Sequence, residues 1–280
     1  MVGTMDAMEL PGEMRHALDG FAADSGPAGT TLMRSLPVGA VPPTPATTAG
    51  HHQAGESLLL AVANRLGEPV GYAQEHGGRL VQNIVPERGG AARQTSTSSA
   101  VTLAWHTETA FHPHKPRYLL LFCLRGDADA KTLLCSAADV LTELDHDTIA
   151  VLRRPRFRTR PDESFLPPGT IGELGPPLAV LTGEQREVVL TYDEDLMVGI
   201  DSEAHAALDR LGAAVRARAT ATTLEAGDLL VVDNHRVVHG RTPFAARFDG
   251  TDRWLLRTFV VSDLAPSAAE REGRIITTRF

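Results

Sequence analysis

The chain has 280 residues, of which 42% are hydrophobic, and a formal net charge of −8 at pH 7. A chain of this length buries a sizeable core, and we expect a single domain over residues 1–280. The excess of acidic over basic residues argues against a nucleic-acid partner, because binding to phosphates needs Lys and Arg in excess.

The first residues and the apolar runs argue against export and against a membrane partner. The start, MVGTMDAMELPGEM, has acidic residues where a secretory signal peptide has a basic region followed by an apolar run. No apolar stretch approaches the length of a membrane span. Cys123 and Cys135 are too few for a disulfide framework and lie in no metal-binding spacing. We therefore expect a cytoplasmic protein with a small-molecule partner and two inert, buried thiols.

An N-terminal region of about residues 1–66 is predicted to be helical and irregular. Helices are expected around residues 12–22 and from residue 57 to about residue 66. Between them, residues 36–54 are rich in Pro, Gly, Thr and Ala. This composition predicts an irregular connection rather than a domain boundary.

Short apolar runs bounded by Gly, Pro and Asp follow, and they are typical of β-strands. They span residues 79–86, 101–108, 117–125, 131–136, 187–193, 228–234 and 253–263. Many short strands without regular crossover helices predict a mainly β fold with flanking helices, either a sandwich or a jelly roll. An amphipathic helix begins at Ser202, and residues 153–177 predict a long loop that is a lid or is disordered.

The segment around residue 106 offers metal ligands. In a strand, His106 and Glu108 point to the same face, which places an imidazole beside a carboxylate. His239, which ends a short apolar run before a Gly-Arg-Thr-Pro turn, is a candidate third ligand. Two histidines and one carboxylate that leave half of an octahedron open form the facial triad of non-haem Fe(II) oxygenases. On the pattern alone, these residues could instead be polar residues at the surface, because a chain with 11 histidines and many carboxylates shows such spacings by chance.

Two arginines alternate with apolar residues further along the chain. Arg253 and Arg257 share one face of a predicted strand with Leu255 and Phe259. Buried arginines are rare unless they pair with an anion, and the guanidinium fork fits a carboxylate. Two inward arginines would therefore indicate two carboxylate-bearing ligands in one cavity. The pattern supports equally the alternative that the opposite face, with Trp254, points inward and both arginines are solvated.

The segments HTETAFHPHKPRYLLLFCLRGD and DNHRVVHGRTPFAARFDGTDRWLLRTFV resemble the clavaminate synthase-like Fe(II)/2-oxoglutarate dioxygenases. The similarity is greatest to the branch of asparagine oxygenase and the viomycin arginine hydroxylase, and RSLPVGAVPPTP and GEPVGYAQEHGGRLVQNIVP extend it over most of the chain. The resemblance implies a double-stranded β-helix (jelly-roll) core that binds Fe(II) through His106, Glu108 and His239. It also implies 2-oxoglutarate and O2 as cosubstrates, with no catalytic residue beyond the iron centre.

Further roles follow from the resemblance by matching position. It implies that Arg253 and Thr132 bind the distal carboxylate of 2-oxoglutarate and that Arg257 binds the α-carboxylate of an amino acid. The polar positions that contact the rest of the substrate in that branch match Gln74 or Glu75, Ser96 or Thr97, and Asp193. Asp195 would double the negative charge if its segment is extended. Two carboxylates favour a cationic side chain such as that of Arg, Lys or ornithine, whereas one also serves an amide such as Asn, and the alternative is a solvated acidic turn.

The reaction implied is oxidative decarboxylation of 2-oxoglutarate to succinate and CO2, coupled to hydroxylation of an unactivated C–H bond. An intact Glu108 favours hydroxylation over halogenation, and we expect attack at C3 of a free L-amino acid in the biosynthesis of a specialised metabolite such as an antibiotic. One alternative keeps the chemistry but uses a substrate bound to a carrier protein, which the basic residues 153–160 would suit, or desaturates the substrate. Others are a metal-binding jelly-roll sensor and a zinc hydrolase with the same ligands.

Overall fold

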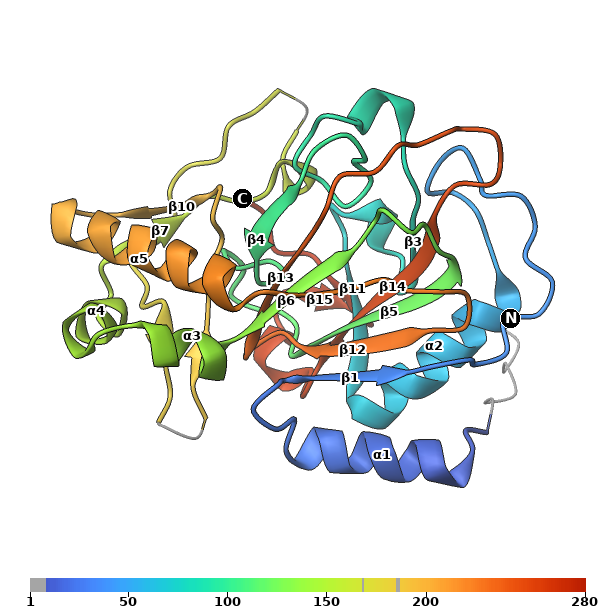
Figure 1. Cartoon of the computed structure of the whole chain (residues 1–280), viewed down its shortest axis with the longest axis horizontal. Coiled ribbons are helices and arrows are strands. Elements are labelled where there is room, and N and C mark those ends of the chain that lie inside the picture. The colour runs from blue at the N-terminus through green and yellow to red at the C-terminus, as the bar shows by residue number, and fades with distance from the viewer. Residues whose placement is uncertain (1–8, 168, 185–186) are drawn as a thin grey trace.

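The computed structural model describes residues 9–167, 169–184 and 187–280 (Figure 1). Residues 1–8, which begin the segment without a signal-peptide pattern, lie outside the described residues. In the part of the chain that is described, no helix has the length and apolar character needed to cross a membrane.

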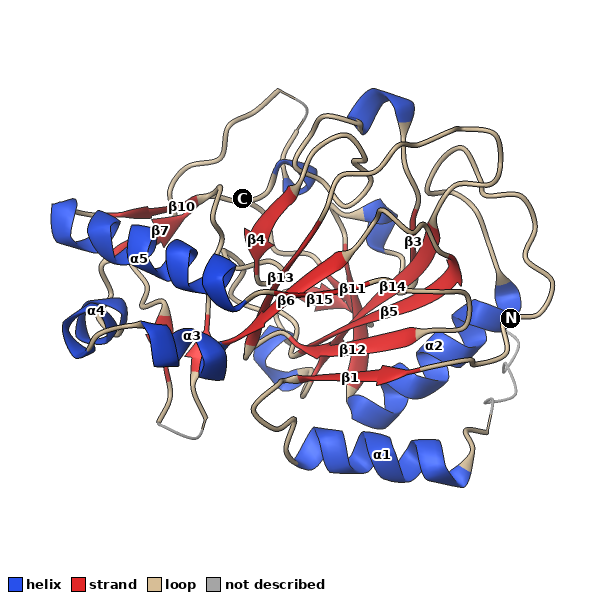
Figure 2. Ribbon diagram, viewed as in Figure 1, coloured by secondary structure: helices blue, strands red, loops and turns tan. Residues whose placement is uncertain are grey.

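The larger sheet has the strand order β1-β12-β5-β14-β2-β16-β15, and β3 also pairs with β14 (Figure 2). Its strands are β1 (Thr30–Met33), β2 (Glu68–Tyr72), β3 (Gln82–Ile84), β5 (Tyr118–Arg125), β12 (Leu229–Asp233), β14 (Trp254–Val261), β15 (Arg271–Glu272) and β16 (Ile275–Ile276). Neighbouring strands are antiparallel, except that β16 runs parallel to β2 with Ile276 opposite Tyr72.

The smaller sheet has the order β11-β6-β13-β4 and shares a core with the larger one. Its strands are β4 (Leu103–His106), β6 (Thr132–Ser136), β11 (Thr220–Thr222) and β13 (Val237–Arg241). Two short antiparallel pairs complete the strands, namely β7 (Phe157–Thr159) with β10 (Met197–Gly199) and β8 (Leu181–Thr182) with β9 (Val189–Leu190).

Helices cover the outer face of the larger sheet and one end of the molecule (Figure 1). They are α1 (Gly12–Ala23), α2 (Gln53–Leu66), α3 (Ala137–Glu143), α4 (His146–Leu152) and α5 (Ser202–Arg218), and short 3-10 turns are η1 (His76–Gly78), η2 (Arg88–Gly90), η3 (Glu163–Phe165) and η4 (Ala265–Ser267). α2 contacts β14 and β5, and α1 packs on α2. α2 begins before the predicted residue 57, because the ring of His52 accepts a hydrogen bond from the Gly55 N–H and caps it.

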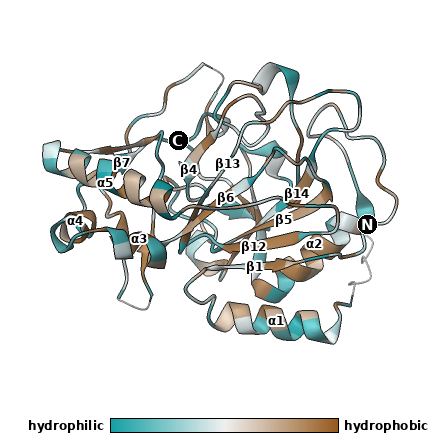
Figure 3. Ribbon diagram, in the orientation of Figure 1, coloured by the Kyte–Doolittle hydropathy of each residue, from teal (hydrophilic) through white to brown (hydrophobic). Residues whose placement is uncertain are grey.

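The central strands of the larger sheet are buried on both faces. In β5, Leu120 and Phe122 join the core beneath α1 and α2, whereas Leu119 and Leu121 join the core between the two sheets. This explains why β5, β12 and β14 are predominantly brown in the hydropathy colouring of Figure 3. A strand with two buried faces shows a continuous apolar run rather than an alternating one.

The same burial resolves the two readings of β14. Trp254 and Leu256 face the helices, while Arg253 and Arg257 face the space between the sheets, where each is only 5% exposed. The prediction of inward arginines is confirmed. The alternative of solvated arginines is wrong, because it assumed that only one face of this strand is buried.

Two other expectations need correction. The region of residues 1–66 is not only helical and irregular, since β1 forms the edge of the larger sheet by pairing with β12. Residues 153–177 are not one structureless loop, because β7 pairs with β10 and η3 follows it. The thiols behave as expected: Cys123 and Cys135 are buried and free, and burial raises the pKa of each to about 12.

Candidate functional site

Two strands of the smaller sheet bring the two predicted histidine ligands together. β4 and β13 are antiparallel neighbours with His106 opposite His239, and the ring centroids lie 4.4 Å apart. Gly240 permits this approach, because a Cβ there would lie 2.7 Å from the carbonyl oxygen of Leu103. His106 Nδ1 donates to the carbonyl oxygen of Ala104 at 2.8 Å, which fixes the ring and leaves Nε2 as the nitrogen for a metal.

Glu108 reaches the histidines from the turn after β4. The strand ends at His106 rather than at residue 108 as predicted, because the chain turns at Thr109, whose φ is +49°. Asn234 holds this turn, accepting from the Glu108 N–H at 2.7 Å and donating to the Glu108 carbonyl oxygen at 3.2 Å. One ligand atom from each of His106, Glu108 and His239 lies within 4.8 Å of the others. Two imidazoles and one carboxylate that converge in this way fit a divalent metal such as Fe(II) or Zn(II).

The electrostatics of the cluster suit metal binding. Burial by itself raises the pKa of Glu108, but Arg257 and His239 outweigh it and hold that pKa at about 2. Burial and the neighbouring His106 lower the pKa of His239. At neutral pH Glu108 is therefore ionised and His239 is neutral, which are the protonation states that a metal ligand requires.

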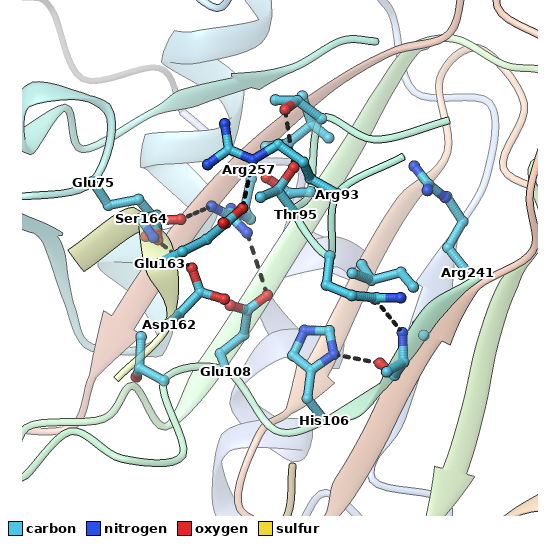
Figure 4. Close-up of a pocket in the computed structure, with 18 of the residues that line it drawn as sticks. Glu75, Arg93, Thr95, His106, Glu108, Asp162, Glu163, Ser164, Arg241 and Arg257 are labelled. Carbon is cyan, nitrogen blue, oxygen red and sulfur yellow. Dashed lines mark hydrogen bonds and ion pairs between the residues drawn. The ribbon is translucent and has the colours of Figure 1, made fainter. Parts of the chain in front are cut away.

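The three residues line a cavity of about 780 Å³ that is large enough for a small molecule (Figure 4). Every other residue that the sequence analysis selected also lines it, namely Gln74, Glu75, Ser96, Thr97, Thr132, Asp193, Asp195, Arg253 and Arg257. The fold thus gathers residues from position 74 to position 257 around one space.

Arg257 is the centre of a buried polar network. Its Nη2 donates to Glu75 Oε1 at 2.5 Å, and its Nη1 lies 3.5 Å from Glu108 Oε1 (Figure 4). Its Nε donates to Gln82 Oε1 at 2.8 Å. Sequence analysis missed Gln82, because a polar residue in a short strand carries no motif. The network joins the carboxylate of the predicted metal site to the end of β2.

Two buried acceptors in the cavity wall lack a donor among the described residues. They are Gln74 Oε1 and Glu75 Oε2. The other atoms of both groups are occupied, since Gln74 Nε2 donates to the carbonyl oxygen of Thr278 and Glu75 Oε1 accepts from Arg257. A buried acceptor without a donor costs about 1–3 kcal/mol. The wall is therefore suited to a ligand with several hydrogen-bond donors, such as an ammonium group.

Another part of the cavity wall is acidic, although it differs from the prediction in detail. Asp195 does not follow Asp193 along an extended face, because Asp193 Oδ1 accepts from the N–H groups of Asp195 and Leu196 and closes a turn. Burial raises the pKa of Asp193, whereas Asp195 is exposed. Glu163 of η3 and Asp162, which caps η3, also line the cavity (Figure 4). Sequence analysis missed them because they lie in a segment without periodicity.

Ser96 and Thr97 lie in the irregular segment between η2 and β4. Thr97 Oγ1 lies 3.3 Å from Thr95 Oγ1. Arg93 Nε in the same segment donates to Glu163 Oε1 at 2.8 Å. This ion pair joins the segment to η3 across the cavity.

Thr132, Arg253 and Arg241 line another part of the cavity. Thr132 lies opposite Arg241 in the register of β6 and β13, and both are buried. Sequence analysis noted Arg241 only as part of a turn, although it lies two residues after His239 on the same strand face. Burial lowers the pKa of Arg241 to about 9 and that of Arg253 to about 10. Neither arginine forms an ion pair with a carboxylate of the described residues.

Most arginines of the basic segment have partners within the chain. Arg156 pairs with Asp201 and Glu203, and Arg160 donates to the carbonyl oxygen of Gly172. Arg153 donates to the carbonyl oxygen of Gly183. These contacts account for the three arginines without a carrier protein.

Comparison with known proteins also indicates a metal-dependent oxygenase. The family model described as taurine catabolism dioxygenase TauD, TfdA family, matches residues 51–259. The L-lysine 3-hydroxylase of Catenulispora acidiphila is 39% identical, covering 98% of this chain and 79% of the relative. The L-asparagine oxygenase of Streptomyces coelicolor is also 39% identical, covering 93% of this chain and 79% of the relative.

Two solved structures share the fold. Asparagine oxygenase in complex with Fe(II), 2S,3S-3-hydroxyasparagine and succinate superposes with a TM-score of 0.90 at 38% identity, over 95% of this chain and 85% of that one. The non-haem iron oxygenase OrfP in complex with Fe and alpha-ketoglutaric acid superposes with a TM-score of 0.85 at 35% identity, over 95% and 86%. These matches confirm the predicted jelly-roll core with flanking helices.

Proposed function

We propose that this chain, which belongs to the TauD, TfdA family of dioxygenases, hydroxylates C3 of a free L-amino acid with a cationic side chain. It is an amino-acid hydroxylase of the 2-oxoglutarate-dependent, non-haem iron class. That class membership favours an oxygenase over the sensor and the zinc hydrolase that the ligand set alone left open.

His106, Glu108 and His239 would hold the iron. Bound there with 2-oxoglutarate and O2, Fe(II) supplies the oxidising power for attack on a C–H bond. The chain itself contributes position and shelter. Asn234 fixes the turn that carries Glu108, and the His106 ring is oriented by its bond to Ala104. Arg253 and Thr132 would bind the distal carboxylate of 2-oxoglutarate.

The unpartnered acceptors beside the Arg257 network carry the proposal for a free amino acid. An α-ammonium group has three donors and would satisfy Glu75 Oε2 and Gln74 Oε1. Arg257 Nη1 makes only the long contact with Glu108 and would face the α-carboxylate. A substrate attached to a carrier protein as a thioester has no α-carboxylate for Arg257. Ser96 and Thr97 would contact the rest of the substrate.

The acidic part of the cavity supports a cationic side chain. Asp162, Asp193 and Asp195 all line the cavity, and no lysine of the described residues does. The partly buried carboxylates Asp162 and Asp193 attract a guanidinium or ammonium group more strongly than exposed carboxylates do, because less water screens them. Lysine, ornithine and arginine are therefore preferred over asparagine. C3 is the position that the name of the L-lysine 3-hydroxylase specifies.

A matched set of substrates tests the proposal. The protein is loaded anaerobically with Fe(II) and 2-oxoglutarate, then exposed to air with lysine, ornithine, arginine, asparagine, Nε-acetyllysine or lysine methyl ester. Mass spectrometry detects the gain of one oxygen, and succinate is measured in parallel. We expect oxidation of at least one cationic amino acid, with little oxidation of acetyllysine, which lacks the side-chain charge, or of the ester, which lacks the α-carboxylate.

Two variants sharpen this result. Asp193→Asn should weaken the binding of a cationic substrate more than the binding of asparagine. Asp209→Asn, on the exposed side of α5, is the matched control. Preferential oxidation of asparagine or of acetyllysine would contradict the cationic class. Equal oxidation of lysine and its methyl ester would contradict the role of Arg257.

A further inference from the structure

Arg241 is the most deeply buried charged group of the cavity that the proposed function leaves without a role. It is 4% exposed and extends from β13, two residues after His239. Successive residues of a strand alternate between faces, so His239 and Arg241 point to the same side, about 6.6 Å apart along the strand. A single strand thus presents a predicted iron ligand and a guanidinium to the same cavity.

The partners of Arg241 account for only part of its hydrogen-bonding capacity. Its Nη1 donates to the carbonyl oxygen of Ser98 at 2.5 Å, and its Nη2 donates to Ser98 Oγ at 2.9 Å. One face of the guanidinium lies 5.0 Å from the ring centre of Phe244. Its Nε is buried and has no acceptor among the described residues. All of these partners are neutral, so nothing in the described surroundings balances the positive charge.

Cross-strand register places Arg241 beside Thr132. In the antiparallel pair β6 and β13, Arg241 lies directly opposite Thr132, and side chains so placed are neighbours on one face of the sheet. Arg253 brings a second buried guanidinium to the cavity, since it also lines it and is only 5% exposed. Two buried guanidinium groups without a carboxylate partner in one cavity favour the binding of an anionic ligand.

The charge distribution of the cavity separates the arginines into two kinds. Arg257 has Glu75 and Glu108 as ion-pair partners, whereas Arg241 and Arg253 have no carboxylate partner among the described residues. A dicarboxylate that binds a metal through one end would therefore bring its second carboxylate to the uncompensated pair. The distance of about 6.6 Å along β13 from His239 to Arg241 is similar to the length of a five-carbon diacid.

We propose that Arg241 is a second anchor for the distal carboxylate of 2-oxoglutarate, with its Nε–H directed at that carboxylate and its Nη groups tied to Ser98. The inference rests on the proposed function, because it assumes 2-oxoglutarate as the cosubstrate. Arg241 would then bind the cosubstrate and select it by its length and charge. Through Ser98 it also connects the cosubstrate to the segment that carries Ser96 and Thr97.

Binding of two 2-oxo acids to the protein loaded with Zn(II) in place of iron tests the assignment without turnover. 2-Oxoglutarate and 2-oxopentanoate have the same carbon chain, but only the first has a distal carboxylate. Titration calorimetry gives both dissociation constants for the wild type, Arg241→Met and Arg241→Lys. Arg88→Met is the control, since Arg88 also stacks on a phenylalanine, Phe248, but does not line this cavity.

We expect Arg241→Met to weaken the binding of 2-oxoglutarate about 10- to 150-fold, the range for a lost charge-assisted hydrogen bond, and to leave the binding of 2-oxopentanoate unchanged. Arg241→Lys should fall between the wild type and Arg241→Met, and Arg88→Met should match the wild type. Equal weakening of both acids would assign Arg241 a purely structural role and overturn the proposal, as would no change in either.

Two further outcomes are also informative. If Arg241→Met does not fold, as judged by circular dichroism, the comparison of Arg241→Lys with wild type decides by the same ratio of the two acids. Wild-type protein that binds no 2-oxoglutarate would overturn the proposed function together with this inference. Wild-type binding that survives in Arg241→Met and Arg241→Lys would overturn the inference alone.

Discussion

Glu75→Gln removes the carboxylate that we propose binds the ammonium group of the substrate. The substitution keeps the shape of the side chain and keeps Oε1 as an acceptor for Arg257, so the network retains its hydrogen bond. It replaces Oε2, which has no donor among the described residues, by an NH2 group, so both the negative charge and the acceptor that we assign to the ammonium group are lost. A hydrogen bond to a charged group contributes about 1.5–3 kcal/mol, which corresponds to a loss of about 10- to 150-fold in affinity.

The assay is the steady-state rate with the amino acid varied at saturating 2-oxoglutarate, repeated with 2-oxoglutarate varied. We expect the KM for the amino acid to rise within that range. The KM for 2-oxoglutarate should stay unchanged, because Arg253 and Thr132, which we propose bind it, line another part of the cavity. Glu68→Gln is the control, since Glu68 also pairs with an arginine, Arg274, at 2.7 Å but at the surface. An unchanged KM for the amino acid in Glu75→Gln would refute the reasoning. An equal loss for both substrates with a lower Tm would show that Glu75 only supports the fold.

Three further predictions follow from other parts of the molecule. His239→Ala should lose Fe(II) binding in calorimetry and all turnover, and a fully active variant would contradict the ligand assignment. Phe165→Ala should raise the ratio of succinate to hydroxylated product. The Phe165 ring holds η3 in place, with its centroid 5.5 Å from that of Tyr72 and 5.0 Å from that of Phe111, and a loosened η3 would admit water to the cavity. An unchanged ratio would contradict this. Burial lowers the pKa of Lys115 from 10.5 to about 8, so the protonated amine destabilises the fold below pH 8 and this cost disappears as the pH rises toward 10.5. Lys115→Met should therefore raise the free energy of unfolding, measured by urea titration at pH 7, by about 1–3 kcal/mol. This gain in stability should shrink between pH 8 and 10.5. A gain that does not depend on pH would contradict the explanation by the buried charge of Lys115.

The chemistry of the site could be predicted from the sequence where a motif fixes both residue type and spacing. His106 and Glu108 are two residues apart, and Arg253 and Arg257 are four apart on one strand, so a local pattern indicates which side chains share a face. The pairing of β4 with β13, which sets His106 opposite His239, joins segments more than 130 residues apart and has no local signal. The resemblance to a family supplied that information.

Other parts of the site had no local pattern to reveal them. Asp162 lies in a segment without periodicity, and its position depends on the aromatic packing of Phe165 rather than on a strand. The pattern of β14 was ambiguous because a strand usually buries only one face, whereas β14 lies between two hydrophobic cores and buries both. Asp195 was misplaced because Asp193 closes a turn with its own side chain, and a turn of this kind changes the face of the next residue.

The parallel pairing of β16 with β2 has a consequence for how the molecule is assembled. Ile275 and Ile276 lie beside Gly71 and Tyr72, and the strand β2 leads directly to Gln74 and Glu75. Contacts between residues this far apart in sequence form late, because closing so long a loop is entropically costly. During synthesis on the ribosome, the part of the cavity wall formed by Gln74 and Glu75 would thus be completed only after residue 276 has emerged. Until then the edge of β2 is an exposed strand open to pairing with another chain.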